Sequence, residues 1–192
     1  DEDGSVDGLD SDVVDGGILG KAAAAGNANG GDASAALDVL RRAADLARDT
    51  GADSVTADHV DHARNEWERT ELERTVTALS DTGKAILYAL ATLTAEQDRS
   101  GEEQPIRTEL ISERYLDLWD QTGMDTVSRR MVRDYLDKME QSGVTSKTFV
   151  QSRSGNFHIH ALNHPPELVV SMVPDIVDLI GHHRDLADAT ED

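Results

Sequence analysis

Three arginines, Arg129, Arg130 and Arg133, lie close together in a stretch whose apolar residues have helical spacing. On a helix that turns by about 100° per residue, they share an arc of about 100° on one side. The opposite side carries a broad apolar face made of Val127, Met131, Val132, Tyr135, Leu136 and Met139. Because an apolar face turns toward a core, the pattern predicts that the arginines face solvent. A guanidinium binds phosphate and pairs bidentately with guanine, so this helix predicts nucleic-acid binding.

The distribution of charge along the chain supports this interpretation. The 192 residues include 38 Asp and Glu against 18 Lys and Arg, which gives a formal net charge of −20. Residues 126–164 contain six basic and three acidic residues and are net positive, whereas the rest of the chain is net negative. The arginine helix therefore lies in the one segment with the electrostatic footprint of a nucleic-acid-binding surface.

A β-hairpin is predicted directly after this helix. Residues 144–151 and 157–162 alternate between apolar and polar types and flank a turn-forming stretch at 152–156. Arg153 and Asn156 would lie at the tip of this hairpin, beside the groove that the helix would enter. The candidate DNA-binding residues are Ser128, Arg129, Arg130, Arg133, Lys147, Arg153, Gly155 and Asn156.

The sequence leaves a second explanation of the three arginines open. Exposed helices often carry ladders of opposite charges three or four residues apart, and Asp134, Asp137 and Glu140 lie within that range. The arginines would then only form surface ion pairs. Against this explanation, all three gather at the N-terminal end of the helix, which is the end that enters the major groove in a helix-turn-helix.

Three helices must position these residues. Apolar periodicity predicts helices over about residues 80–93, 108–121 and 126–142, the last ending at Gly143 as a helix with a left-handed cap does. Three helices followed by a two-stranded ribbon is the order of a winged helix. The fold class predicted for this part of the chain, residues 71–192, is therefore a mainly α winged-helix domain.

The N-terminal part of the chain predicts a smaller helical unit, residues 1–70. Residues 1–31 are rich in Asp, Gly, Ala and Asn and lack periodicity, so we expect them to be poorly ordered. A first helix should start after Asp32, with an apolar face made of Leu37, Leu40, Ala44 and Ala47. A second helix should begin at Thr56 and continue to Leu79.

Motifs for several other functions are missing. The chain has no Cys, which excludes a disulfide scaffold and a cysteine zinc site. Residues 16–22 resemble a phosphate-binding loop only faintly, because Asp15 and Ala22 stand where that loop needs Gly and Ser or Thr. No hydrolase or nucleotide-binding motif is present, so we assign no catalytic residue and no cofactor and do not expect an enzyme.

The histidines suggest a metal site only weakly. His158 and His160 lie on one face of the second predicted strand, and His59 and His62 lie about one helical turn apart. Neither pair is joined by Cys or by a tight group of carboxylates at a recognisable spacing, so we expect no metal site.

The acidic composition indicates the environment of the protein. The chain has 25 Asp and 13 Glu but 14 Arg and only 4 Lys. A carboxylate-rich surface suits concentrated salt, where its self-repulsion is screened. The composition is therefore typical of a protein from the cytoplasm of a halophile. An acidic partner-binding or DNA-mimicking protein would instead carry its acid in blocks, and here it is spread along the helices. No apolar run approaches the roughly 20 residues that cross a bilayer, and the acidic N-terminus does not resemble a signal peptide.

Two motifs resemble the archaeal replication initiators of the origin recognition complex and cell division control family. Residues 31–43, Gly-Asp-Ala-Ser-Ala-Ala-Leu-Asp-Val-Leu-Arg-Arg-Ala, with residues 55–60, resemble the helical lid of its AAA+ ATPase. Residues 128–136, Ser-Arg-Arg-Met-Val-Arg-Asp-Tyr-Leu, with residues 79–93, resemble its C-terminal winged helix. The resemblance implies a protein that binds double-stranded DNA at a replication origin. It also implies other initiator copies or a replicative helicase as partners.

The sequence departs from the family in three ways. The ATPase core, with its phosphate loop and Mg-binding acid, is missing, so we expect a fragment or a truncated paralogue. Ser34 replaces the lid arginine that reaches toward nucleotide phosphate in the family, so no nucleotide-binding residue is assigned. The hairpin tip carries one arginine, Arg153, where family wings often carry two around a Gly.

An apolar helix predicted over residues 168–180, bent or restarted at Pro174, allows two other functions. It could dock a helicase or a second copy of the chain, or it could be the dimer helix of a stand-alone transcriptional regulator. The apolar stripe that would make these contacts consists of Leu168, Val169, Met172, Val173, Ile176 and Leu179.

Overall fold

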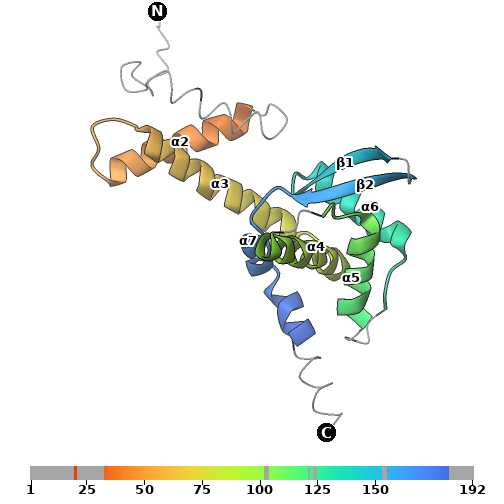
Figure 1. The fold of residues 1–192 in the computed structure, drawn as a ribbon. Coiled ribbons are helices and arrows are strands. Elements are labelled where there is room, and N and C mark those ends of the chain that lie inside the picture. Colours follow the sequence, from red (N-terminus) through yellow and green to blue (C-terminus); the bar gives the residue numbers. More distant parts are fainter. Residues whose placement is uncertain are drawn as a thin grey trace, which may run out of the picture. The chain divides into compact units, whose positions relative to one another are not determined.

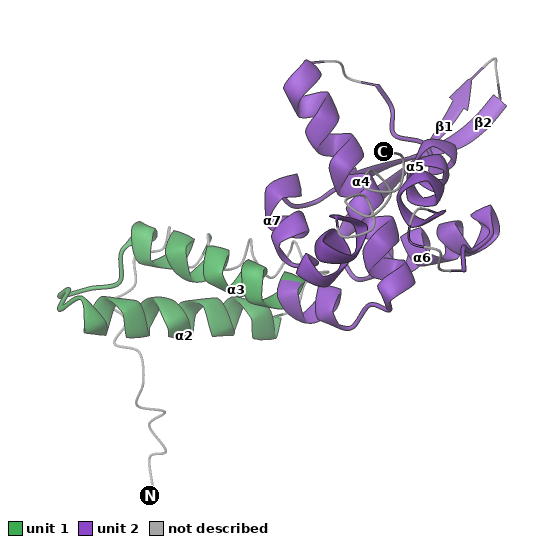
Figure 2. Ribbon diagram, turned by 90° about the horizontal axis from the view of Figure 1, so that it is seen from below, with its two compact units in different colours: residues 1–72 green, residues 73–192 purple. Residues whose placement is uncertain are grey.

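The computed structural model describes residues 20, 33–101, 104–120, 122, 125–152 and 155–181. The chain divides into two compact units, residues 1–72 and 73–192 (Figure 2). The poor order expected of residues 1–31 lies, apart from residue 20, outside the described residues. No helix in the described part of the chain is both long enough and apolar enough to span a membrane.

In the described part of the first unit, residues 33–72, two helices lie side by side (Figure 1 and Figure 2). Helix α2 spans Ala33–Asp49, and helix α3 spans Ala57–Thr77 and so continues past the end of this unit. At the start of α3, the hydroxyl of Thr56 accepts from the backbone N of His59 at 3.4 Å, and His59 Nδ1 accepts from the backbone N of Thr56 at 3.1 Å. This reciprocal cap fixes where α3 begins. The core of the unit consists of Ala35, Val39, Ala43, Ala47, Val55, Val60, Ala63 and Trp67.

The predicted apolar face of α2 is wrong at Leu37, which is 64% exposed. The buried residues of α2 instead follow a strict spacing of four from Ala35. Leu37 is two residues further along the helix and therefore points about 200° away from Ala35. The predicted Ala47 is buried, and Leu40 and Ala44 pack against the core from its edge.

The second unit has the predicted winged-helix order (Figure 1). Three helices come first, and the hairpin of β1 and β2 follows them. A short helix, α7, and a helical segment at residues 174–181 come after the hairpin in the described part of the unit. The bounds are α4 Asp81–Ser100, α5 Thr108–Asp120, α6 Arg129–Gln141, β1 Thr145–Ser152, β2 Gly155–Leu162 and α7 Pro166–Ser171.

The hairpin is antiparallel, with a register that runs from Thr145 opposite Leu162 to Ser152 opposite Gly155. A third segment, not predicted from the sequence, extends this sheet on the other side of β2. Arg107 forms an antiparallel bridge with Ile159, and the backbone N of His160 donates to the carbonyl of Ile106 at 2.9 Å. Ile106 and Arg107, directly before α5, are therefore strand-like.

Helix α4 is the centre of the second unit, since α5, α6, α7 and β2 all contact it. The stripe predicted after the hairpin contributes to this core: Val169, Val173 and Ile176 are buried. These residues are not available to dock a helicase or a second chain. The docking and dimer-helix explanations of the stripe are therefore wrong for half of its members, because the winged helix uses them to complete its own core.

Candidate nucleic-acid interface

Helix α6 carries the predicted DNA-reading surface, and it is anchored at its N-terminus and along its core face. Ser128 is the N-cap, with its hydroxyl accepting from the backbone N of Met131 at 3.4 Å. Val132, Leu136 and Met139 are buried. Such a seam fixes the rotation of the helix about its own axis, and with it the direction of every other side chain.

The prediction that Met131 lies on this core face is wrong, because its side chain is 45% exposed. On the helix, Met131 lies about 100° from the centre of the seam formed by Val132, Leu136 and Met139, which leaves it at the margin. An exposed apolar side chain is thus added to the solvent-facing side of α6.

Arg129, Arg130 and Arg133 are exposed, as predicted. Among the described residues none of the three forms an ion pair, so the explanation that they pair with Asp134, Asp137 and Glu140 finds no support in the structure. Two of these acids have a different partner. Lys147 Nζ lies 2.8 Å from Asp137 Oδ1 and 3.0 Å from Glu140 Oε2.

These contacts place Lys147 differently from the arginines. Its hydrogen bonds to Asp137 and then Glu140 raise the pKa of the ammonium group. The side chain is 24% exposed and connects β1 to α6. Lys147 therefore holds the hairpin against the helix, and its contact with DNA stays a prediction.

The hairpin tip is described only in part. Arg153 lies outside the described residues. Gly155 has a φ of 125°, which favours glycine, and its carbonyl accepts from Ser152 Oγ at 3.0 Å. Asn156 is exposed and lies opposite Gln151. Within the described residues, no hydrogen bond or ion pair connects Gly155 or Asn156 to the α6 arginines, so the two parts of the predicted surface are separate elements.

Arg107 is a further basic residue of the second unit, and the sequence patterns do not single it out. It is exposed, and its Cζ lies 3.7 Å from the centroid of the Phe157 ring. The charge of its segment concealed it, because residues 71–125 are net negative by seven. The one signal in the sequence was its position just before a predicted helix of the winged-helix pair.

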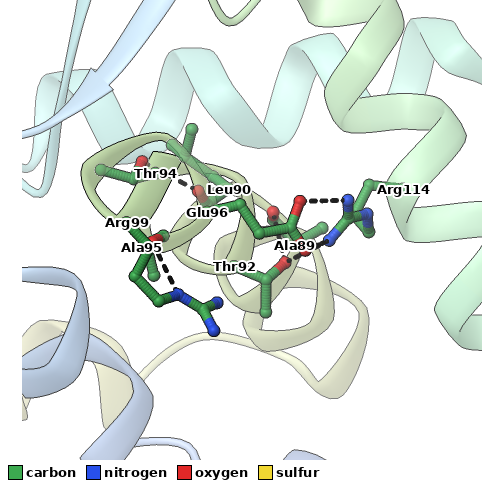
Figure 3. Close-up of polar contacts among 8 residues, drawn as sticks. All are labelled: Ala89, Leu90, Thr92, Thr94, Ala95, Glu96, Arg99 and Arg114. Carbon is green, nitrogen blue, oxygen red and sulfur yellow. Dashed lines mark hydrogen bonds and ion pairs between the residues drawn. The ribbon is translucent and has the colours of Figure 1, made fainter. Parts of the chain in front are cut away.

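Helix α5, which precedes α6 in the helix-turn-helix, is clamped to α4 by a bidentate pair (Figure 3). Arg114 Nη1 and Nη2 each donate to one carboxylate oxygen of Glu96 at 2.7 Å, and Nη1 also donates to the hydroxyl of Thr92 at 3.4 Å. The hydrogen bond from Arg114 lowers the pKa of Glu96. This pair sets α5, and through it the turn into α6, against the rest of the domain.

Four histidines, His59, His62, His158 and His160, take part in hydrogen bonds, ion pairs or ring packing within the fold. His160 is 1% exposed, and its Nε2 lies 2.9 Å from the hydroxyl of Thr108. The His158 ring packs on Phe149 with 5.3 Å between ring centroids. His59 caps α3, and His62 lies 3.5 Å from Glu66. Where the structure describes the chain, no three metal-ligating side chains gather at one place.

Comparison with protein families accounts for both units. Residues 5–65 match the Cdc6 AAA+ ATPase-type lid domain, and residues 74–172 match the CDC6 C-terminal winged helix domain. Ser34, in the exposed first turn of α2, lies within the lid match.

Similar proteins include ORC1-type DNA replication protein 11 of Haloarcula marismortui, 30% identical over 93% of this chain and 42% of its own length. ORC1-type DNA replication protein 10 of Halobacterium salinarum is 32% identical over 85% of this chain and 39% of its own length. The Aeropyrum pernix ORC1 protein, solved in complex with DNA, has a TM-score of 0.72 at 26% identity, over 86% of this chain and 42% of that one. The chain thus spans about two fifths of the length of these relatives, and it belongs to the family of Cdc6 and ORC1-type replication proteins through its lid and its C-terminal winged helix.

Proposed function

We propose that this chain binds duplex DNA through α6 and the β1–β2 hairpin and serves in replication-origin recognition. The observation that carries the proposal is the set of three exposed arginines on α6. In a chain with a net charge of −20, ion-pair partners are abundant, yet Arg129, Arg130 and Arg133 form none within the described residues. Cations left exposed on the second helix of a helix-turn-helix are placed as a DNA-binding surface requires.

The residues would divide the work by their position on α6. Arg129 and Arg130 occupy its first turn, the part that reaches base edges, where an arginine can pair with the O6 and N7 atoms of guanine. Arg133 lies one turn further and would bind a phosphate. Ser128, whose hydroxyl oxygen already accepts one hydrogen bond, can still donate its proton to a phosphate oxygen.

The hairpin would contact the DNA beside the major groove that α6 would enter. Arg153 and Asn156 would bind the backbone or the minor groove, and Gly155 would allow the tight turn that presents them. Lys147 can add to the local positive potential, although two carboxylates hold its ammonium group.

The relatives support a role at replication origins. They carry the name of ORC1-type replication proteins, and the structural relative is bound to DNA. By this relationship we propose that the chain acts in the initiation of replication in the cytoplasm of a halophilic archaeon, alongside initiator copies or a helicase. We assign no catalytic step to it.

The test measures, by fluorescence anisotropy, the affinity of the full chain for origin-derived and random-sequence duplexes in molar potassium chloride. The double variant Arg129→Ala with Arg130→Ala should lose affinity and sequence preference, at about 1 to 3 kcal/mol for an arginine that reads guanine. The matched control is Arg41→Ala with Arg42→Ala, an exposed arginine pair on α2 that removes the same charge. If the α6 variant binds every duplex as the wild type does, the proposal is wrong.

A further inference from the structure

The segment that carries Arg107 is held rigidly. Its neighbours Ile106 and Thr108 are buried, 5% and 4% exposed. Ile106 accepts from the backbone N of His160, and Arg107 both bridges to Ile159 and accepts from the backbone N of Ile111 at 3.1 Å. The backbone of Arg107 is thus tied to the sheet on one side and to the first turn of α5 on the other.

The side chain of Arg107 is held as well. Residues opposite one another in a sheet share a face, as do residues two apart on a strand, so Arg107 shares a face with Ile159 and Phe157. Its guanidinium carbon lies 3.7 Å from the centroid of the Phe157 ring. This distance is well within the roughly 6 Å range of a cation–π contact.

Stacking of this kind covers a flat side of the guanidinium but leaves its N–H donors at the edge. No carboxylate lies within ion-pair distance of Arg107 among the described residues. Arg114 of α5 differs in this respect, because it is bound to Glu96. Arg99 of α4 has no carboxylate within ion-pair distance in the described part of the chain either, but its guanidinium donates to the carbonyl of Ala95 at 3.0 Å.

The chemistry of this arrangement fits one class of ligand. A planar, permanently charged fork of N–H donors matches the oxygens of a phosphate. A guanidinium that is already ordered loses less side-chain entropy on binding than a mobile one. Its place is also suitable, because Arg107 directly precedes α5, the first helix of the helix-turn-helix, which crosses the DNA backbone in such motifs.

We propose that Arg107 binds a phosphate of the DNA backbone, and that Phe157 is the residue that positions its guanidinium. The contact would extend the interface from α6 and the hairpin tip to the outer face of the sheet. It rests on the proposed DNA-binding function. It adds affinity that is independent of base sequence, since phosphates carry no sequence information.

The experiment measures the affinity of the full chain for a random-sequence duplex over a series of potassium chloride concentrations. Arg107→Ala should reduce affinity roughly tenfold at fixed salt. It should also make the negative slope of log K against log salt less steep by about 0.9, the value for one phosphate contact. The matched control is Arg99→Ala, an exposed arginine of the same unit, which should leave the slope unchanged.

Phe157→Leu tests the positioning role. It keeps the charge of Arg107 but removes the aromatic ring, so it should weaken binding and make the further change of Arg107→Ala less costly than in the wild type. A shift of the melting temperature alone, with wild-type affinity and salt slope in Arg107→Ala, would mean that the stack only stabilises the sheet, and it would overturn the inference. Loss of the α6 arginines distinguishes the two proposals. If that variant loses binding while Arg107→Ala does not, the proposed function stands and this contact does not.

Discussion

At the scale of single residues, His160 shows what burial does to a titratable group. The ring is almost fully buried, its Nε2 contacts Thr108, and its Nδ1 has no hydrogen-bond partner among the residues that the structure describes. Burial lowers the pKa of this histidine, and the nearby His158 and Lys147 lower it further. A charged imidazolium would place a second N–H in the core without an acceptor, so the folded state holds this ring neutral.

This burial predicts a pH dependence of folding. Since the folded pKa is lower than the unfolded value of about 6.5, the unfolded chain takes up the proton first as the pH falls. The stability contributed by neutral His160 is complete above that pH and is lost below it, at up to about 1.4 kcal/mol per pH unit. Urea unfolding from pH 8 to pH 5 should show this loss, and His160→Gln should flatten it.

The matched control for this experiment is His158→Gln, on the same strand. His158 is only half-buried, and it contributes less than burial does to the lowered pKa of His160, so its replacement should leave most of the loss of stability in place. An equally steep dependence in His160→Gln and in the wild type would assign the effect to other groups.

Met131 and Leu136 allow a second test at this scale, since both belong to the apolar side predicted for α6. Leu136 is fully buried whereas Met131 is 45% exposed. Leu136→Ala should therefore cost about 2 to 5 kcal/mol of unfolding free energy, and Met131→Ala about 0.5 kcal/mol or less. Urea denaturation at constant salt measures both. A cost above about 2 kcal/mol for Met131→Ala would show that the Met131 side chain is buried in the core and would contradict this prediction.

At the scale of elements, the Arg114–Glu96 pair links α4 to α5 across the surface. Because the Glu96 side chain is 50% exposed, screening limits its contribution, and a coupling of about 0.5 to 1 kcal/mol is expected. A double-mutant cycle with Arg114→Met and Glu96→Gln in urea at neutral pH measures this coupling. Since the pKa of Glu96 is lowered, the coupling should be present above its unfolded pKa and vanish as the pH falls through the folded value. A coupling that persists in strong acid would contradict an ionic origin.

The elements also show where sequence patterns are informative. Helices α4, α5 and α6 were predictable because each buries a stripe repeated over several turns. The strand-like stretch at Ile106 and Arg107 was not, since two residues are too few to show an alternation. Leu37 and Met131 were misassigned because each lies away from a narrow buried seam, which only the neighbouring helix defines.

The candidate interface was predictable to a similar extent. The exposure of Arg129, Arg130 and Arg133 followed from the helical wheel, because the wheel depends only on local geometry. The partners of Lys147 could not be predicted from the helical wheel, since Asp137 and Glu140 contact it only once β1 folds back along α6. Arg107 was hidden for the same reason: Phe157 is fifty residues further along the chain.

At the scale of the whole molecule, the net charge of −20 predicts that folding depends on salt. Like charges on a compact chain repel one another over the Debye length, which is about 3 Å at 1 M salt and about 10 Å at 0.1 M. Lowering the salt therefore lengthens the range over which the carboxylates repel one another, and unfolding to an expanded chain relieves this repulsion.

We expect the helical circular dichroism signal and the melting temperature to fall as potassium chloride is removed by dialysis. Neutralising exposed carboxylates, as in the triple variant Asp38→Asn, Asp49→Asn and Asp98→Asn, should move the midpoint of this transition to lower salt, because repulsion is its cause. A variant that instead replaces exposed Arg41 and Arg42 by Ala makes the net charge more negative and should move the midpoint the other way. An unchanged signal and melting temperature at about 0.1 M salt would show that this surface tolerates its own charge, and would remove the physical basis for assigning the protein to a salt-rich cytoplasm.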